Sequence, residues 1–287
     1  MASQALERLQ TTTAPPPVRL IGLPMERGKH GVMIKPGELV DIVEISPLNL
    51  TELRVYNQLI ANAWPRITDP VVHKIRKSDL KGTHESNDRL KDSIRTLMRS
   101  IAEVKVIKDD EPGTMEVQLL GANIKHDRAD GFFYYKFPEE LIQIFQRSEV
   151  FAKLKTRIMY AFTSKYALRL YEIVQKRVNL DYLQYEEFTV DEFRNLLGTP
   201  KGKLVRVADF NKHALKPAIE EVNFLGDYVV EVMPIKQGRK LVRFRLFWFK
   251  KDRAGLAETW EELERHRTGR RARMRNRVEA TADAPAS

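Results

Sequence analysis

The residue types best suited to chemistry in this chain are the basic side chains that cluster in its C-terminal third. Between residues 236 and 245, five lysine or arginine residues occur with no acid among them. Such side chains neutralise phosphates and release counterions, which gives affinity for nucleic acid. The alternative is an ordinary solvated surface. The elements that carry these residues distinguish the two interpretations. The five residues are Lys236, Arg239, Lys240, Arg243 and Arg245.

A second set of polar side chains belongs to residues 209–223, which the sequence predicts to be a helix. A rotation of about 100° per residue places several of them together, opposite the apolar stripe that contains Phe210 and Leu215. Pro217 removes one backbone hydrogen bond from this helix, so we expect it to be kinked. The candidate DNA-binding residues on and just before this helix are Lys203, Arg206, Lys212, His213, Lys216 and Asn223.

The N-terminal half carries a weaker basic set. Its arginines between residues 86 and 101 are mixed with Asp88 and Asp92, as on an ordinary exposed helix, while the lysines before them tilt the balance modestly toward DNA. We therefore expect this half to make accessory DNA contacts or to contact protein. The accessory candidates are Lys74, Arg76, Lys77, Lys81, Arg89, Arg95 and Arg99.

Patterns for catalysis or for metal and cofactor binding do not reach the required spacing. The segment 198–204 faintly resembles a phosphate-binding loop, but three residues separate its glycines instead of four, and Leu204 stands where a hydroxyl should bind magnesium. The histidines are scattered, cysteine is absent, and the acids at 109–111 beside Pro112 and Gly113 fit a hairpin turn. We expect no catalytic residue, no metal and no cofactor, which also argues against an initiator that nicks DNA.

The elements that must position these basic residues occur in the same order twice along the chain. Apolar residues at helical spacing predict helices over 48–64, 76–81 and 86–101. Two strands, 104–107 and 115–120, follow as a hairpin with its turn at 110–113. A further strand over 132–137 and a helix opened by Pro138 complete this half, which we place at residues 46–150.

The same order of elements occurs again in the second half. Ser164 begins a helix that runs to residue 178, and Thr189 with Glu192 forms a capping box for a helix closed by Gly198. The helix at 209–223 and a hairpin of strands 228–233 and 241–249, turning at 236–239, come next. Three helices and a hairpin, found twice, predict an α+β protein of two tandem winged-helix domains, the second at residues 151–250, with the boundary near 147–155.

The two ends of the chain differ from these halves in composition. Residues 1–45 include runs of threonine and proline, and we expect them to be mostly flexible. The formal net charge is +10, and most of this excess lies in seven arginines between residues 265 and 277. Residues 251–287 are therefore predicted to be a charged helix and a basic tail, which could be a phosphate-binding arm, a solvated end, or an acidic-to-basic helix folded against itself. No apolar run suits a membrane span, and we expect a cytoplasmic protein.

Several segments are similar to a known family. They are residues 163–172, 188–198 and 215–223 in the second half, and residues 77–80 and 86–90 in the first. These segments resemble the replication initiator proteins of theta-replicating iteron plasmids over roughly residues 45–250. Pro217 stands where such proteins also tend to have a proline.

The resemblance implies a division of function between the two domains. The C-terminal domain would be the principal reader of directly repeated sites, the iterons, in double-stranded origin DNA, while the N-terminal domain would touch DNA and mediate dimerisation. Dimers would repress the initiator's own promoter, and monomers would help to melt the origin and recruit the host initiator and the replicative helicase. The alternative is a dimeric winged-helix transcriptional regulator without initiator activity, which would share the fold.

Overall fold

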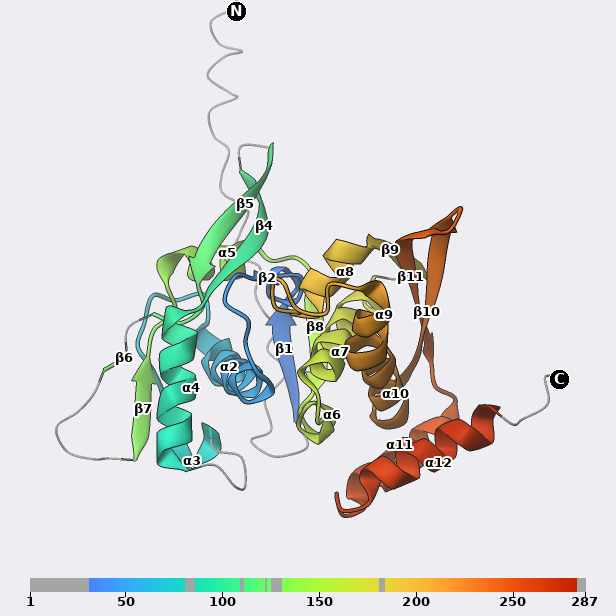
Figure 1. Ribbon diagram of the computed structural model, residues 1–287. Helices are drawn as coiled ribbons and strands as arrows, with labels where there is room; N and C mark the ends of the chain where they lie inside the picture. The colour runs from blue at the N-terminus through green and yellow to red at the C-terminus, as the bar shows by residue number, and fades with distance from the viewer. Residues whose placement is uncertain are drawn as a thin grey trace, which may run out of the picture.

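The structure is a computed structural model, and it describes residues 31–80, 86–108, 111–121, 123–124, 131–180 and 184–282. Lys81, the turn residues 109–110 and the expected flexible residues 1–30 lie outside these ranges. Figure 1 shows two mixed helical and stranded halves side by side, with the C-terminal helices beneath the second. The buried apolar residues form one continuous cluster, so the halves pack on each other through a common core.

The segment before residue 46 is structured from residue 31, so the expectation of a mostly flexible segment was wrong for residues 31–45. It forms β1 (Val32–Pro36), α1 (Gly37–Val40) and β2 (Val43–Glu44). Strand β1 pairs antiparallel with β8 (Phe151–Lys155), which lies in the stretch predicted to be a boundary. Because the two partners are far apart in sequence, neither short strand shows a repeating pattern that identifies it alone.

Two helices of the first half lie close to their predicted ranges. Helix α2 (Leu50–Ala63) starts with a capping box between Asn49 and Glu52. A 3₁₀ turn that contains Pro65, η2 (Trp64–Arg66), follows it directly. Helix α4 (Asn87–Arg99) begins at the Ser86 cap. The helix predicted over 76–81 is shorter than expected: β3 (His73–Arg76) runs to Arg76 and only α3 (Lys77–Leu80) is helical.

The strands of the first half form two three-stranded sheets. The predicted hairpin is confirmed as β4 (Ile101–Lys108) with β5 (Glu111–Gln118), and β2 lies on its other edge. The predicted turn at 110–113 was misplaced, because Pro112 and Gly113 pair with β4 as part of β5. In the second sheet, β7 (Phe132–Tyr135) lies between β3 and β6 (Asn123–Ile124), and α5 (Glu139–Arg147) follows.

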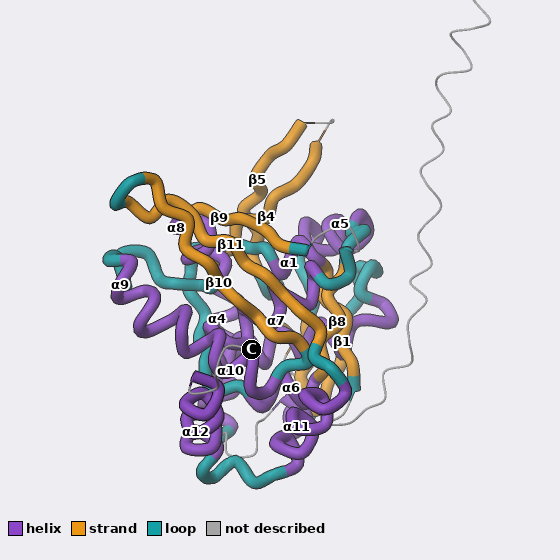
Figure 2. Tube along the Cα trace, turned by 90° about the vertical axis from the view of Figure 1, so that its right-hand side faces the viewer, coloured by secondary structure: helices purple, strands orange, loops and turns teal. Residues whose placement is uncertain are grey.

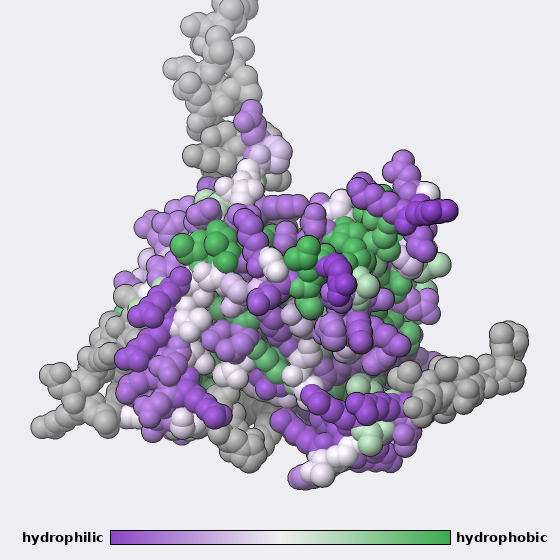
Figure 3. Space-filling model, viewed as in Figure 1, coloured by the Kyte–Doolittle hydropathy of each residue, from purple (hydrophilic) through white to green (hydrophobic). Residues whose placement is uncertain are grey.

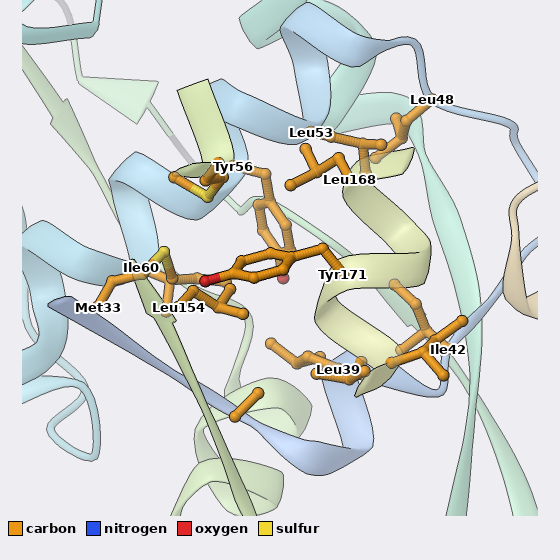
Figure 4. Packing of buried hydrophobic residues seen from close by; sticks show 14 of the residues in the cluster. Met33, Leu39, Ile42, Leu48, Leu53, Tyr56, Ile60, Leu154, Leu168 and Tyr171 are labelled. Carbon is orange, nitrogen blue, oxygen red and sulfur yellow. The ribbon is translucent and has the colours of Figure 1, made fainter. Parts of the chain in front are cut away.

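Helix α7 (Lys165–Arg177), which follows the short α6 (Thr156–Ala161), joins the two halves. Figure 4 shows Leu168 and Tyr171 of α7 turned toward Tyr56 and Ile60 of α2 and toward Leu154 of β8. On its other side α7 packs against the helix α10 described below. Ten of its thirteen residues are buried, so this helix is part of the core of both halves.

A buried charge network centred on Glu172 of α7 reinforces this junction. The Glu172 carboxylate accepts hydrogen bonds from Lys35 Nζ at 2.9 Å and from Asn57 Nδ2 at 2.6 Å, while Arg169 lies 3.4 Å away. Burial alone would raise the pKa of this carboxyl, but the charges of Lys35 and Arg169 outweigh burial and hold the pKa below its ordinary value. A second bridge joins Arg177 of α7 to Asp41 at 2.9 Å. Removing one member of the network would leave another charge buried without compensation.

The second half repeats the winged-helix order as predicted. Strand β9 (Tyr185–Thr189) leads into α8 (Val190–Leu196), which starts at the predicted capping box of Thr189 and Glu192. One continuous helical segment then comprises α9 (Val207–Phe210), the π-helical turn η3 (Asn211–Leu215) and α10 (Lys216–Leu225). Strands β10 (Tyr228–Gln237) and β11 (Lys240–Lys250) form the hairpin, with β9 on the far edge of β11.

The C-terminal residues form two further helices that fold back on the body. Helix α11 (Arg253–Glu264) begins at the Asp252 cap, and α12 (Arg270–Ala282) packs beside it (Figure 2). Glu262 of α11 accepts hydrogen bonds from Arg270 at 3.1 Å and Arg273 at 2.7 Å. Of the three interpretations of this tail, the helix folded against itself therefore describes these residues. Within the described residues, no helix is long and apolar enough to cross a membrane.

Candidate nucleic-acid interface

The loop between α8 and α9 is held in place by Arg194. Its guanidinium donates to the carbonyl oxygens of Lys203 at 2.8 Å and Val205 at 3.0 Å, and it lies 5.4 Å from the centre of the Phe210 ring. Gly198 and Gly202 adopt positive φ angles of 66° and 77° in this loop, which favour glycine. Arg194 is thus a positioning residue that the sequence analysis missed, although the two glycines indicated a tightly turned loop.

The π-helical turn η3 presents exposed side chains from the middle of the third helix. Asn211, Lys212 and His213 are exposed there, whereas Ala214 and Leu215 are fully buried. A π turn accommodates one extra residue, and it ends two residues before Pro217, which cannot donate a backbone hydrogen bond. This wider turn lies where the sequence predicts a kink, and the kink itself stays a prediction.

The other predicted residues of this helix divide into exposed cations and one structural residue. Lys203 and Lys216 are exposed, and Lys216 Nζ lies 3.9 Å from Glu220. Arg206 is 82% exposed but pairs with Asp209 at 2.8 Å. Asn223 must be withdrawn from the candidate set, because its side-chain amide bonds both the N–H and the carbonyl of Val230 and so fixes the start of β10.

The tip of the second hairpin carries three accessible cations. Gly238, with φ of 61°, and Arg239 form the two-residue turn between the paired residues Gln237 and Lys240. Lys236, Arg239 and Lys240 are all exposed, and none has an ion-pair partner among the described residues. This tip therefore presents positive charge that no nearby carboxylate among those residues neutralises.

Arg243 and Arg245 lie farther along β11 in a different electrostatic setting. Glu187 of β9 lies 2.6 Å from Arg245 and 3.8 Å from Arg243, and Arg245 also stacks 4.7 Å from the Tyr185 ring centre. Both arginines alternate with the buried Phe244, so they point to the sheet face away from the core. The sequence showed no acid between residues 236 and 245, but the neighbouring strand supplies one, and these two arginines are partly neutralised.

The accessory residues of the first half that the structure describes are spread over three elements, β3, α3 and α4. On β3, Lys74 and Arg76 cover the Phe132 ring, with Lys74 Nζ 3.9 Å from its centre. Lys77 is half-buried at the start of α3, and Lys81 lies outside the described residues. On α4, Arg89, Arg95 and Arg99 are exposed, but Arg95 pairs with Asp92 at 3.3 Å.

The basic helices of the two halves lie on one face of the molecule. In Figure 1, α4 and the α9–η3–α10 segment are both turned toward the viewer, with the β4–β5 hairpin above α4 and the β10–β11 hairpin beside α9 and α10. The space-filling view of the same face is largely hydrophilic over α4 and over the C-terminal helices (Figure 3). Among the described residues, no group of three or more His, Cys, Asp or Glu side chains is placed to hold a metal ion. The arrangement can bind a polyanion along this face.

Comparison with known proteins agrees with this architecture. Residues 34–175 match a family model described as an initiator replication protein WH1 domain, and residues 189–248 match one described as an initiator Rep protein WH2 domain. A crystal structure of the Pi initiator protein in complex with iteron DNA is similar at 18% identity with a TM-score of 0.54, covering 78% of this chain and all of that one. Comparison with curated proteins gives no match.

The first family model extends through α7, which we had assigned to the second domain, and this agrees with the position of that helix in the core of both halves. Two tandem winged-helix domains, identified by both family models and arranged as the structure shows, place the chain in the initiator Rep protein family.

Proposed function

We propose that this protein binds directly repeated iteron sites in double-stranded DNA at a plasmid origin and initiates replication there. The observation that carries the proposal is the exposed cation set on η3 and on the tip of the second hairpin, in a chain whose family is that of initiator Rep proteins. In a winged helix, the third helix enters the major groove and the hairpin contacts the flanking backbone. The similar Pi initiator is seen with iteron DNA, which supports the same class of ligand here.

The proposed mechanism is binding and distortion of DNA, with no chemical step performed by the chain. Lys212 and His213 would reach base edges from the π turn, while Lys236, Arg239 and Lys240 would contact phosphates. The energy of these contacts would offset the cost of bending and helping to melt the origin. Recruitment of host replication proteins, dimerisation and repression of the protein's own promoter belong to the same proposal.

The binding part is tested by neutralising the tip of the hairpin. Arg239→Ala/Lys240→Ala should weaken binding to a duplex that carries direct repeats, spaced about two helical turns centre to centre. The slope of log K against log salt should become less steep by about 0.9 for each phosphate that the variant no longer neutralises, as measured by fluorescence anisotropy. Unchanged affinity and slope would show that the hairpin tip does not contact DNA.

A matched control lies on the same hairpin. Arg243→Ala/Arg245→Ala removes the same formal charge from β11, but these side chains are already paired with Glu187. We expect a smaller change in slope from this pair than from the pair at the tip. An equal effect would mean that net charge, and not the position of the tip, governs binding.

The initiation part requires a separate readout. A plasmid that contains only a repeat-bearing origin should be maintained when the protein is supplied from a second replicon, and the Arg239→Ala/Lys240→Ala variant should fail to maintain it. Specific binding without plasmid maintenance would favour the transcriptional regulator and would contradict the proposed initiation.

A further inference from the structure

The C-terminal helices lie beyond both family models, the second of which ends at residue 248, yet they are firmly attached to the winged-helix domains. Arg270 donates to the Ala161 carbonyl at 3.4 Å and to Glu262, and Arg267 donates to the Tyr160 carbonyl at 3.2 Å. Lys251 Nζ donates to Thr259 at 2.7 Å. Helix α12 is therefore fixed in place before any ligand binds, which lowers the entropy cost of using its exposed face.

The arginines of α12 divide into two sets with different surroundings. Arg270 is buried and Arg273 is half-buried, and both are engaged by Glu262. Arg271 and Arg275 are exposed, and neither has an ion-pair partner among the described residues. The charge of Arg271 acts on the carboxylate of Glu221, which already accepts hydrogen bonds from the backbone N–H groups of Thr163 and Ser164.

The position of α12 places this exposed pair beside the candidate interface. Helix α12 contacts α10, the C-terminal part of the third helix of the second domain. In Figure 1, α12 crosses in front of α11 below α10, and in Figure 2, turned by 90°, α9 and α12 lie toward the same side. Elements such as α5 and β8 lie on the opposite side in Figure 2. A duplex bound along α9 and η3 would thus pass near α12.

The spacing of the pair suits the backbone of a nucleic acid strand. Residues four apart on a helix rise by about 6 Å, and side chains at this spacing share one face. Phosphates follow one another about every 3.4 Å along the axis of a B-DNA strand, so two steps nearly match that rise. No acid occurs between residues 265 and 278 that would repel a phosphate.

We propose that Arg271 and Arg275 of α12 form a third DNA contact, independent of sequence, with phosphates flanking the site covered by the two winged-helix domains. This inference rests on the proposed DNA binding. It assigns to the C-terminal helix pair a role in lengthening the footprint, whereas Arg270 and Arg273 of the same helix attach it to the body.

The test measures the binding of the full chain to two duplexes that carry the same repeat, one trimmed to the repeat and one with long flanks. Arg271→Gln/Arg275→Gln should bind the long duplex several-fold more weakly, with a salt slope less steep by about 2 if both arginines neutralise phosphates. On the trimmed duplex the variant should bind like the parent. Arg271→Lys/Arg275→Lys keeps the charge and should restore most of the affinity for the long duplex.

The matched control is Arg147→Gln/Lys153→Gln, which removes the same charge from exposed positions of α5 and β8. It should leave both affinities unchanged. The proposal is overturned if the α12 variant binds the long duplex as the parent does, if the control weakens binding equally, or if the variant loses only affinity for a protein partner. If the parent protein itself did not bind the repeat specifically, the proposed function would be refuted instead.

Discussion

The third helices of the two domains differ in regularity and in how their cations are partnered. In the first domain, α4 is a regular helix of thirteen residues that carries the ion pairs Lys91–Asp88 and Arg95–Asp92. In the second domain, the helix widens into the π turn η3, where Lys212 and His213 are exposed without an acid paired to them among the described residues. Paired surface cations must give up a carboxylate when they bind phosphate, so they contribute less binding free energy than unpaired cations do.

This difference indicates how one fold, used twice, divides its function. A charge-mixed helix suits accessory backbone contact or a protein partner, whereas an unpaired basic turn with a basic hairpin tip suits reading of DNA. Helix α7 belongs to the core of both domains. We therefore expect it to fix the separation between α4 and the α9–η3–α10 segment.

The largest effect is expected at the junction, from Glu172→Ala. The substitution leaves Lys35 buried without its partner, and breaking a buried pair in this way costs about 3–5 kcal/mol of unfolding free energy. Urea denaturation measures the loss, and Glu116→Ala, which removes an exposed carboxylate from β5, is the control with little effect. Unchanged stability of the Glu172 variant would mean that the junction does not depend on this network.

An intermediate effect separates the two third helices. Lys212→Ala/His213→Ala should weaken binding to the repeat by about 1–3 kcal/mol for each base contact removed, and much less on an unrelated duplex. Arg89→Ala/Arg99→Ala on α4 should weaken binding to both duplexes alike, because phosphate contacts carry no sequence information. Parallel titrations of the two duplexes measure the ratio. If the α4 pair alone changes that ratio, the assignment of the reading domain is reversed.

The smallest effect is a pH dependence confined to the first domain. Burial lowers the pKa of His73, which packs against Tyr135 and Phe137, and the charge of Arg66 lowers it further. The unfolded chain then takes up a proton more readily than the folded one, so this contribution to stability is complete above about pH 6.5 and is lost as pH falls below it. The free energy of unfolding should therefore fall between pH 7 and pH 5, by less in His73→Phe. Equal falls in the two proteins would remove His73 as the cause.

Local signals in the sequence predicted the helices and hairpins but not their long-range partners. The caps at Ser86, Ser164 and Thr189 and the turn at Gly238 act within a few residues, so their positions are visible in the sequence. Strand β1 was missed because β8 stabilises it from more than a hundred residues away. Contacts between residues distant in sequence were also not predictable in the candidate site.

Within the candidate site, exposure could be predicted and pairing could not. The cations at the hairpin tip lie on the surface, as a polar turn requires. Glu187, which neutralises Arg243 and Arg245, comes from another strand, and the hydrogen bonds of Asn223 depend on where β10 begins. A helical wheel also assumes a constant rotation per residue, and η3 departs from it.

The π turn offers one more consequence for recognition. Because η3 holds one residue more than an α-helical turn would, it offsets the angular position of the side chains before it relative to those after it, while Ala214, Leu215 and Ala218 keep their places in the core. Moving or removing this single-residue offset would re-aim Lys212 and His213 without repacking the interior. Binding preference in such a domain would thus depend on the phase of the backbone as well as on the identity of its side chains.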